Sequence, residues 1–328
     1  MLRKSGLFSF VVMSLLVAGT HSSLAQGLDR PVSDRGGVAN AAEVGPRGRT
    51  EVTPSVGPAT VTRAQIERTG AEFVDVDGPA PLSSLVAESL RGTDPTAESV
   101  LGWDSRMRMR TTAYPNRAIG LITIGADNAH LCTGWLISPN TVATAGHCVH
   151  TGGTSGSWQD RATMRFWPGR DGVDSPFGSC TVARLHSVAG WTRDGNSEYD
   201  YGALRLNCTV GNSTGWFGMY SVPQTRGFLN QPAITAGYPG DQPQTQWLSA
   251  DIVRVSQARR VCYRMDTVGG QSGSPVWHDR DNALNASGAW AFAIHAYGDN
   301  GACGTSFNNG PRLSESRIAN FIGWINRL

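Results

Sequence analysis

Long hydrophobic runs are missing from this chain of 328 residues after residue 25. Since a membrane-spanning helix needs roughly 20 consecutive apolar residues, the sequence predicts no transmembrane segment. The one apolar run, Leu7 to Ala18, is too short to span a bilayer comfortably; it follows Arg3 and Lys4 and precedes small residues that end at Ala25. This order predicts a signal peptide over residues 1–25, and hence a secreted, extracellular protein without a membrane anchor.

Aromatic residues are scarce between positions 26 and 98, where Phe73 is the only one; all ten tryptophans come later. A segment with so few large apolar side chains, and with much Gly, Pro, Ala, Glu and Arg, buries too little area to fold alone. We therefore predict that residues 26–98 are a propeptide, either loosely folded or ordered only against something else. Residues 99–328 are the predicted folded domain.

Neither part carries a strong excess of charge. Residues 26–98 hold seven Arg against eleven acidic residues, and residues 99–328 hold 19 Arg against 15, so the net charges are −4 and +4. Opposite charges favour association, which makes the protein's own propeptide an expected partner of the domain. Neither part is basic enough to predict nucleic-acid binding.

Cysteine is absent from the first 131 residues. The six that follow predict three disulfides in an exported chain, although six cysteines allow about fifteen connectivities. We expect Cys132 to pair with Cys148, and chain order suggests Cys180 with Cys208 and Cys262 with Cys303. No C-x-x-C or clustered His/Cys spacing indicates metal ligation, so no metal or cofactor is predicted.

Long helical periods are also absent until the C-terminus. Instead, short apolar stretches alternate with turn residues, among them AIGLITIG (118–125), LCTGWLIS (131–138), YGALRLN (201–207) and AWAFAIHA (289–296). This pattern predicts an all-β barrel or sandwich. At the end of the chain, Ser314 or Ser316 can cap a helix, and the apolar residues that follow have helical spacing. They predict one amphipathic helix, and its apolar face consists of Ile318, Phe321, Ile322, Ile325 and Leu328.

Three short motifs carry residues that are suited to nucleophilic catalysis. TAGHC places His147 after a small-residue strand end, EYDYGALRL places Asp200 at the mouth of a strand, and GGQSGSP places Ser272 in a glycine-rich loop. A serine hydroxyl becomes a good nucleophile when a histidine takes its proton and a buried carboxylate holds that histidine in the correct tautomer. Each motif alone is weak, but the three in this order are much more specific.

Together with GYPGD (237–241), these motifs resemble those of the trypsin-fold serine peptidases, specifically the glutamyl endopeptidase (V8-like) family. The similarity covers most of residues 99–328 but not the propeptide. It implies two six-stranded antiparallel β-barrels, about 99–215 and 216–328, with the catalytic cleft between them and a monomer that cuts proteins or peptides. In this resemblance, His147 is general base and acid, Asp200 orients it, Ser272 is the nucleophile, and the Gly270 and Ser272 amides form the oxyanion hole.

The resemblance also implies a pocket for the substrate carboxylate, because a buried charge needs hydrogen-bond donors or an opposite charge. Thr267 and His295 match the positions that the glutamyl branch uses, and in some relatives the mature N-terminal amine, here that of Ser99, contributes. Asp266 supports a rival specificity, because it lies six residues before Ser272, where trypsins hold the acid that binds Arg or Lys.

Glutamate is scarce in the predicted mature enzyme, which contains only Glu198 and Glu315 beside 19 Arg. Lysine is rarer still, with Lys4 alone, so a genomic bias is one explanation. It does not account for the six Glu of the much shorter propeptide, whereas an enzyme that cuts after Glu, and more weakly after Asp, must avoid its own preferred residue. The last propeptide Glu directly precedes the family-like start SVLGWD, and we predict processing at Glu98–Ser99.

Two other functions compete with this interpretation. An α/β-hydrolase esterase wants G-x-S-x-G around the nucleophile, but position 274 is Ser and the alternation of strands and helices is missing. A secreted trypsin-fold binding protein without activity is the other alternative. Such proteins usually have a broken triad, whereas His147, Asp200 and Ser272 are all present.

Overall fold

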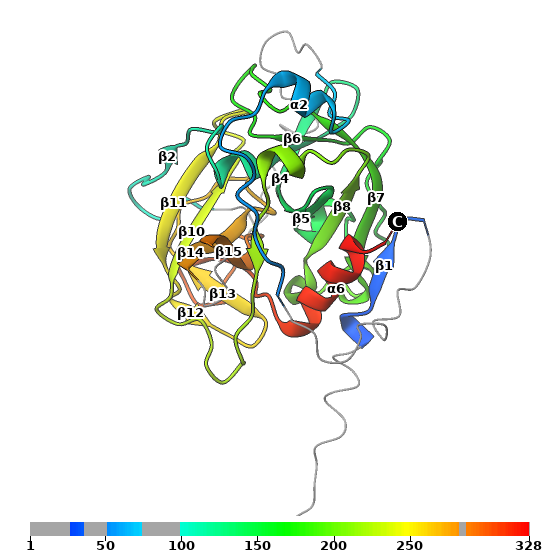
Figure 1. The fold of residues 1–328 in the computed structure, drawn as a ribbon. Helices are drawn as coiled ribbons and strands as arrows, with labels where there is room; N and C mark the ends of the chain where they lie inside the picture. The colour runs from blue at the N-terminus through cyan, green and yellow to red at the C-terminus, as the bar shows by residue number, and fades with distance from the viewer. Residues whose placement is uncertain (1–26, 36–50, 74–98, 282–286, 328) are drawn as a thin grey trace, which may run out of the picture.

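The computed structural model describes residues 27–35, 51–73, 99–281 and 287–327, and most of its regular structure is β-strand (Figure 1). The predicted signal peptide and Glu98 lie outside these residues. In the part of the chain that is described, no helix is both long and apolar enough to cross a membrane.

The N-terminal half is a closed antiparallel barrel. Its strands follow the order β7-β6-β3-β4-β5-β8, and β8 pairs with β7 to close the circle. The members are β3 (Ile119–Ile124), β4 (Ala129–Ser138), β5 (Thr141–Thr144), β6 (Arg165–Pro168), β7 (Cys180–Val188) and β8 (Gly202–Leu206). Phe166, Leu136 and Leu204 are buried on one shared face of these strands, whereas Trp135 points from the other face and packs on Phe217.

The C-terminal half contains a six-stranded sheet, in the order β2-β11-β10-β14-β15-β9, and a three-stranded sheet, in the order β12-β13-β16. A bridge between Ala293 and Arg312 connects the two sheets. The first consists of β2 (Met107–Arg108), β9 (Gly218–Met219), β10 (Pro232–Gly237), β11 (Trp247–Ile252), β14 (Pro275–Asp281) and β15 (Ser287–Ile294). The second consists of β12 (Val255–Ser256), β13 (Arg260–Tyr263) and β16 (Asn308–Pro311).

Helices are few and short in the described residues, as the sequence predicts. They are α2 (Arg63–Glu67), α4 (Ala189–Thr192), α5 (Gly211–Thr214) and α6 (Glu315–Ile325), with 3₁₀ turns η2 (Asn116–Ala118), η3 (Gly146–Cys148) and η4 (Ser197–Tyr199). Ser314 caps α6: its side chain accepts a hydrogen bond from the Arg317 amide. α6 lies against β5 and β8 of the first barrel, with Ile318, Phe321 and Trp324 among its buried residues (Figure 1). The all-β fold with a barrel and a C-terminal helix is thus confirmed.

Three disulfides join Cys132 to Cys148, Cys180 to Cys208, and Cys262 to Cys303, which are the pairings suggested by chain order. The first connects β4 to η3, immediately beside His147. The second links the start of β7 to the residues after β8, and the third links β13 to a loop of the C-terminal half. Each disulfide therefore holds together elements of a single half.

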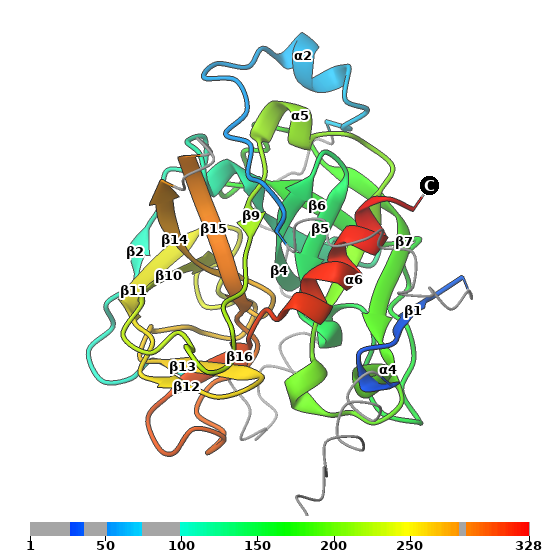
Figure 2. The same ribbon diagram turned by 60° about the horizontal axis from the view of Figure 1, so that its bottom comes forward.

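The described parts of the predicted propeptide are ordered against the domain. β1 (Pro31–Ser33) adds to β7 (Figures 1 and 2). Isolated bridges join Val52 to Met219, Ser55 to Trp216 and Glu72 to Ser179. Three side chains of this segment, Val52, Ile66 and Ala71, belong to the main hydrophobic cluster. The segment gains order by completing surfaces of the domain rather than by forming a core of its own.

Candidate active site

His147 and Asp200 meet because β5 and β8 pair antiparallel. Thr144 at the end of β5 lies opposite Gly202 at the start of β8, so the turn after β5 is adjacent to the residue that precedes β8. The Asp200 carboxylate is fully buried; one oxygen accepts the His147 backbone amide at 2.7 Å, and the other lies 2.7 Å from Nδ1 of the same residue. This two-point contact fixes the ring and leaves Nε2 as the nitrogen that faces outward from the pair.

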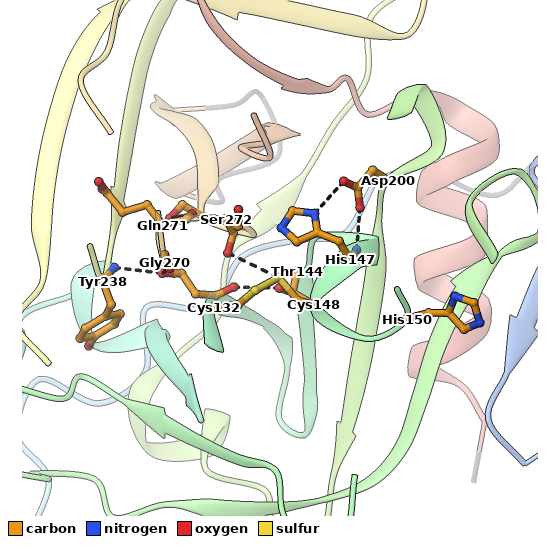
Figure 3. The surroundings of a disulfide bond; sticks show 12 residues. Cys132, Thr144, His147, Cys148, His150, Asp200, Tyr238, Gly270, Gln271 and Ser272 are labelled. Atoms are coloured by element: carbon orange, nitrogen blue, oxygen red, sulfur yellow. Dashed lines mark hydrogen bonds and ion pairs between the residues drawn. A yellow bond between two sulfur atoms is a disulfide. The ribbon is translucent and has the colours of Figure 1, made fainter. Parts of the chain in front are cut away.

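Ser272 is held at the junction of the two halves. Its carbonyl oxygen accepts a hydrogen bond from the Thr133 amide of β4 at 2.9 Å, and it lies 3.7 Å from Sγ of Cys148. That second contact is van der Waals packing, because a disulfide sulfur has no hydrogen to donate. The backbone of Ser272 is therefore fixed beside the residue that follows His147, and Figure 3 shows the imidazole between Asp200 and Ser272.

Two glycines let the Ser272 loop pack tightly on the first barrel. Gly270 and Gly273 have φ values of +102° and +90°, in the region that side chains disfavour. A Cβ on Gly273 would lie 2.2 Å from the Thr133 carbonyl oxygen, and one on Gly270 would lie 2.7 Å from His130. The motif GGQSGSP thus has its glycines where the backbone requires them.

The Gly269–Gly270 and Gln271–Ser272 peptide planes are oriented by hydrogen bonds that their carbonyl oxygens accept. The Gly269 carbonyl accepts the Gly240 amide at 2.7 Å, and the Gln271 carbonyl accepts the amide of Ser274 at 2.9 Å and its hydroxyl at 2.6 Å. In a trans peptide the N–H points opposite to the C=O of the same plane. The N–H groups of Gly270 and Ser272 therefore point away from those partners, in fixed directions.

The three residues predicted to bind substrate lie in one network, in which Thr267 and His295 are buried and Ser99 is half-buried. Thr267 Oγ1 accepts a hydrogen bond from Asn308 Nδ2 at 3.0 Å, and the same nitrogen lies 2.6 Å from the Ser99 carbonyl oxygen. His295 is fully buried, and its Nδ1 lies 2.7 Å from the hydroxyl of Tyr263, which is opposite Asn308 in the β13–β16 pairing. The His295 carbonyl accepts the Gly273 amide at 2.7 Å, which connects the network to the Ser272 loop.

Asp266 has a different environment from these residues. Its carboxylate accepts hydrogen bonds from the Leu101 amide at 2.7 Å, the Ser105 amide at 2.8 Å and the Ser105 hydroxyl at 2.6 Å. It is 3% exposed. The side chain thus fastens residues 101–105, at the start of the predicted mature enzyme, to the C-terminal half.

Sequence reasoning missed Tyr263, Asn308 and Tyr297, although each contacts a predicted site residue. Tyr297 donates a hydrogen bond from its hydroxyl to Asp200 Oδ2. The only signal in the sequence was the proximity of Tyr297 to His295, two positions earlier, because a tyrosine or asparagine in a strand carries no motif.

One cluster resembles a metal site in its composition. Atoms of Cys132, His147 and Cys148 that could bind metal lie within 4.8 Å of one another. Cysteine binds metal as a thiolate, and here both sulfurs are joined in a disulfide. These three residues do not fit a metal ion.

Known peptidases are similar to this chain in sequence. Residues 132–285 match the family model of the trypsin-like peptidase domain. The chain is 42% identical over 231 residues to a glutamyl endopeptidase of Bacillus licheniformis, with 70% of each protein covered. It is 35% identical over 234 residues to a Bacillus subtilis protein named extracellular metalloprotease, again with 70% of each covered.

Solved structures give the same fold. The structure of a Glu endopeptidase in complex with MPD aligns with a TM-score of 0.59 and 25% identity, over 70% of this chain and 100% of that one. A thermostable serine protease, AL20, aligns with a TM-score of 0.51 and 22% identity, over 64% of this chain and 98% of the other. The first of these two structures is that of a protein named Glu endopeptidase.

Proposed function

Because the chain belongs to the glutamyl endopeptidase family of trypsin-like serine endopeptidases, we propose that it cuts proteins preferentially after Glu, and more slowly after Asp. The observation that carries the proposal is the buried Asp200 carboxylate, which contacts both the backbone amide and the ring Nδ1 of His147 beside the tightly packed Ser272 loop.

In this proposal Ser272 attacks the scissile carbonyl while His147 takes its proton. Asp200 keeps Nδ1 protonated, so that Nε2 can accept, and it stabilises the imidazolium that forms. His147 then returns the proton to the leaving amine, an acyl-enzyme remains on Ser272, and water activated by the same histidine hydrolyses it. The developing oxyanion needs donors with fixed directions. The Gly270 and Ser272 amides are our candidates, since hydrogen bonds of their own peptide planes orient them.

Preference for Glu rests on the network of Thr267, His295 and Ser99. A substrate carboxylate there would be surrounded by hydroxyl, amide and imidazole groups, which can replace the water that it loses. Asp has one methylene less, a difference worth about 1–3 kcal/mol, so slower cleavage after Asp is expected. The rival pocket acid, Asp266, already accepts three hydrogen bonds from residues 101–105, which argues against its use for substrate Arg or Lys.

We further propose that the protein is secreted as a zymogen in which residues 1–25 are the signal peptide and 26–98 the propeptide. Cleavage at Glu98–Ser99 would convert the Ser99 amide, 3.3 Å from Asn308 Oδ1, into a charged amine. A positive charge beside Thr267 would complement a Glu side chain. Processing would thus complete the pocket, and the mature protein would act as a monomer on protein or peptide substrates.

The experiment is a peptide-library digest by the processed protein, with Ser272→Ala as the control. Cleavage after Glu, weaker after Asp, and lost in the variant supports the proposal. Cleavage chiefly after Arg or Lys would instead favour the Asp266 pocket. If neither protein cleaves and a serine-directed phosphonate labels neither, the chain is a non-catalytic binding protein.

A further inference from the structure

Tyr297 lies directly behind the proposed catalytic pair. It is 8% exposed, its hydroxyl donates to Asp200 Oδ2, and its ring centroid lies 6.1 Å from that of His147. The Asp200 oxygen that it reaches is the same one that lies 2.7 Å from His147 Nδ1. The carboxylate thus receives donors from three directions: the His147 amide, the His147 ring and the Tyr297 hydroxyl.

We propose that Tyr297 is a positioning residue, which sets the rotation of the Asp200 carboxylate so that His147 is held ready to accept the proton of Ser272. This inference rests on the proposed triad. A fully buried carboxylate cannot be solvated by water, so its ionised form depends on the donors that surround it. A tyrosine hydroxyl is an effective donor to a charged oxygen, and it fixes the plane of the carboxylate through its own rigid ring.

The backbone of Tyr297 is itself fixed by β16. Its amide donates to the Asn309 carbonyl at 3.0 Å, and the Asn309 amide donates back to the Tyr297 carbonyl at 2.8 Å. Such a reciprocal pair leaves the side chain little freedom to move along the strand direction. The hydroxyl is therefore placed by the sheet rather than by a flexible loop.

Arg260 of β13 connects this arrangement to the Asp200 segment. Its guanidinium lies 5.7 Å from the Tyr297 ring centroid, and it donates to Asn309 Oδ1 and, at 2.8 Å, to Ser197 Oγ. Ser197 opens η4, the turn that ends one residue before Asp200. Burial lowers the pKa of Arg260, so these contacts compensate a desolvated cation. The guanidinium thus connects Asn309, which holds the backbone of Tyr297, to η4, which precedes Asp200.

Tyr297 also lies two positions after the proposed specificity residue His295, in the segment that follows β15. A tyrosine hydroxyl contacts each of the two proposed functional groups: that of Tyr263 contacts the His295 ring, and that of Tyr297 contacts Asp200. The same chemical change, Tyr→Phe, therefore removes one hydroxyl from the substrate pocket and one from the triad. The two variants separate binding from chemistry.

The test compares Tyr297→Phe with Tyr263→Phe, and with Tyr114→Phe as a control whose lost hydroxyl contacts the Trp216 carbonyl, remote from the triad. For Tyr297→Phe we expect kcat about tenfold lower with KM nearly unchanged, because a bond to a charged group is lost and the substrate pocket is intact. Tyr263→Phe is expected to raise KM for Glu substrates, and Tyr114→Phe to change neither constant.

A pH profile distinguishes positioning from mere folding. The acid limb of kcat/KM reports protonation of the general base. Without the tyrosine donor, the Asp200 carboxylate is a stronger partner for the imidazolium form of His147, so the acid limb should move to higher pH. Arg260 and Glu198, the neighbouring charged groups, are unchanged in the variant. Unchanged kcat and an unchanged limb in Tyr297→Phe would overturn the inference. Activity that survives Ser272→Ala would instead overturn the proposed triad.

Discussion

Replacement of Asp266 by Asn tests which residue determines specificity, because the side chains have nearly the same shape. The carboxylate accepts the Leu101 amide with one oxygen and the Ser105 amide and hydroxyl with the other. An asparagine has only one acceptor oxygen, so its NH₂ group must face a backbone N–H. If the asparagine oxygen faces Ser105, its NH₂ group takes the place of the Asp266 oxygen that lies 2.7 Å from the Leu101 amide nitrogen in the native protein. Two donors would then face each other.

The cost follows from these contacts. One charge-assisted hydrogen bond is lost and one buried N–H is left opposite another donor, which together give about 2–5 kcal/mol. For a domain of this size, a loss of 3 kcal/mol lowers Tm by roughly 6–12 °C. Because Leu101 and Ser105 follow Ser99, the start of the mature chain should detach first. Specificity for Glu should then weaken through KM, while hydrolysis of a small uncharged ester changes little.

The assay is thermal unfolding together with kinetics on matched Glu, Arg and ester substrates. Asp171→Asn is the control, since Asp171 pairs with Arg108, just after the same segment, with side chains that are 34% and 58% exposed, and such surface pairs contribute about 0–1 kcal/mol. A wild-type enzyme that cuts after Arg, combined with an Asp266→Asn variant that loses this cleavage at unchanged Tm, would refute our reasoning and assign Asp266 to the substrate.

Three further variants test the pocket, the processing site and the propeptide. His295→Ala should lower kcat/KM after Glu by about 100-fold and leave the ester within about twofold, as kinetics on both will measure; equal losses would contradict a carboxylate partner. Glu98→Gln should prevent release at Ser99, and N-terminal sequencing that still finds Ser99 would rule out self-processing. Ile66→Asp places a charge in the core cluster that the propeptide completes, so it should reduce the yield of secreted enzyme, whereas exposed Ala59→Asp should not. The mature sequence is identical in both, so unequal specific activity would indicate a defect other than folding.

The sequence predicted the fold well because its signals are local. Strand-length apolar runs, turn residues and the C-terminal helical spacing each fall within a short window, and the disulfides followed chain order. His147, Asp200 and Ser272 were also found from short motifs, and the structure brings the first two into contact. Trp324 of α6, which is 1% exposed, was missed because it falls between the apolar positions that define the helical spacing.

Contacts across long separations could not be predicted in the same way. The position of Asp266 before Ser272 matched a trypsin pocket, yet its hydrogen-bond partners are 161 and 165 residues away. Likewise, nothing near Tyr297 in the chain marks it as a partner of Asp200, 97 residues earlier. A motif specifies which groups are available, whereas their partners depend on how β13, β15 and β16 assemble.

The structure adds a physical reason for the survival of the two glutamates in the predicted mature enzyme. Glu198 lies in η4 and Glu315 in the first turn of α6, so both are in helical backbone. A peptidase that binds its substrate as an added strand needs an extended segment, and a helical turn must unfold locally before it can enter such a site. The Arg317 guanidinium further anchors the carbonyl of Glu198 at 2.5 Å. If the proposed preference for Glu holds, resistance to self-digestion would depend both on how few glutamates remain and on the structure in which each one lies.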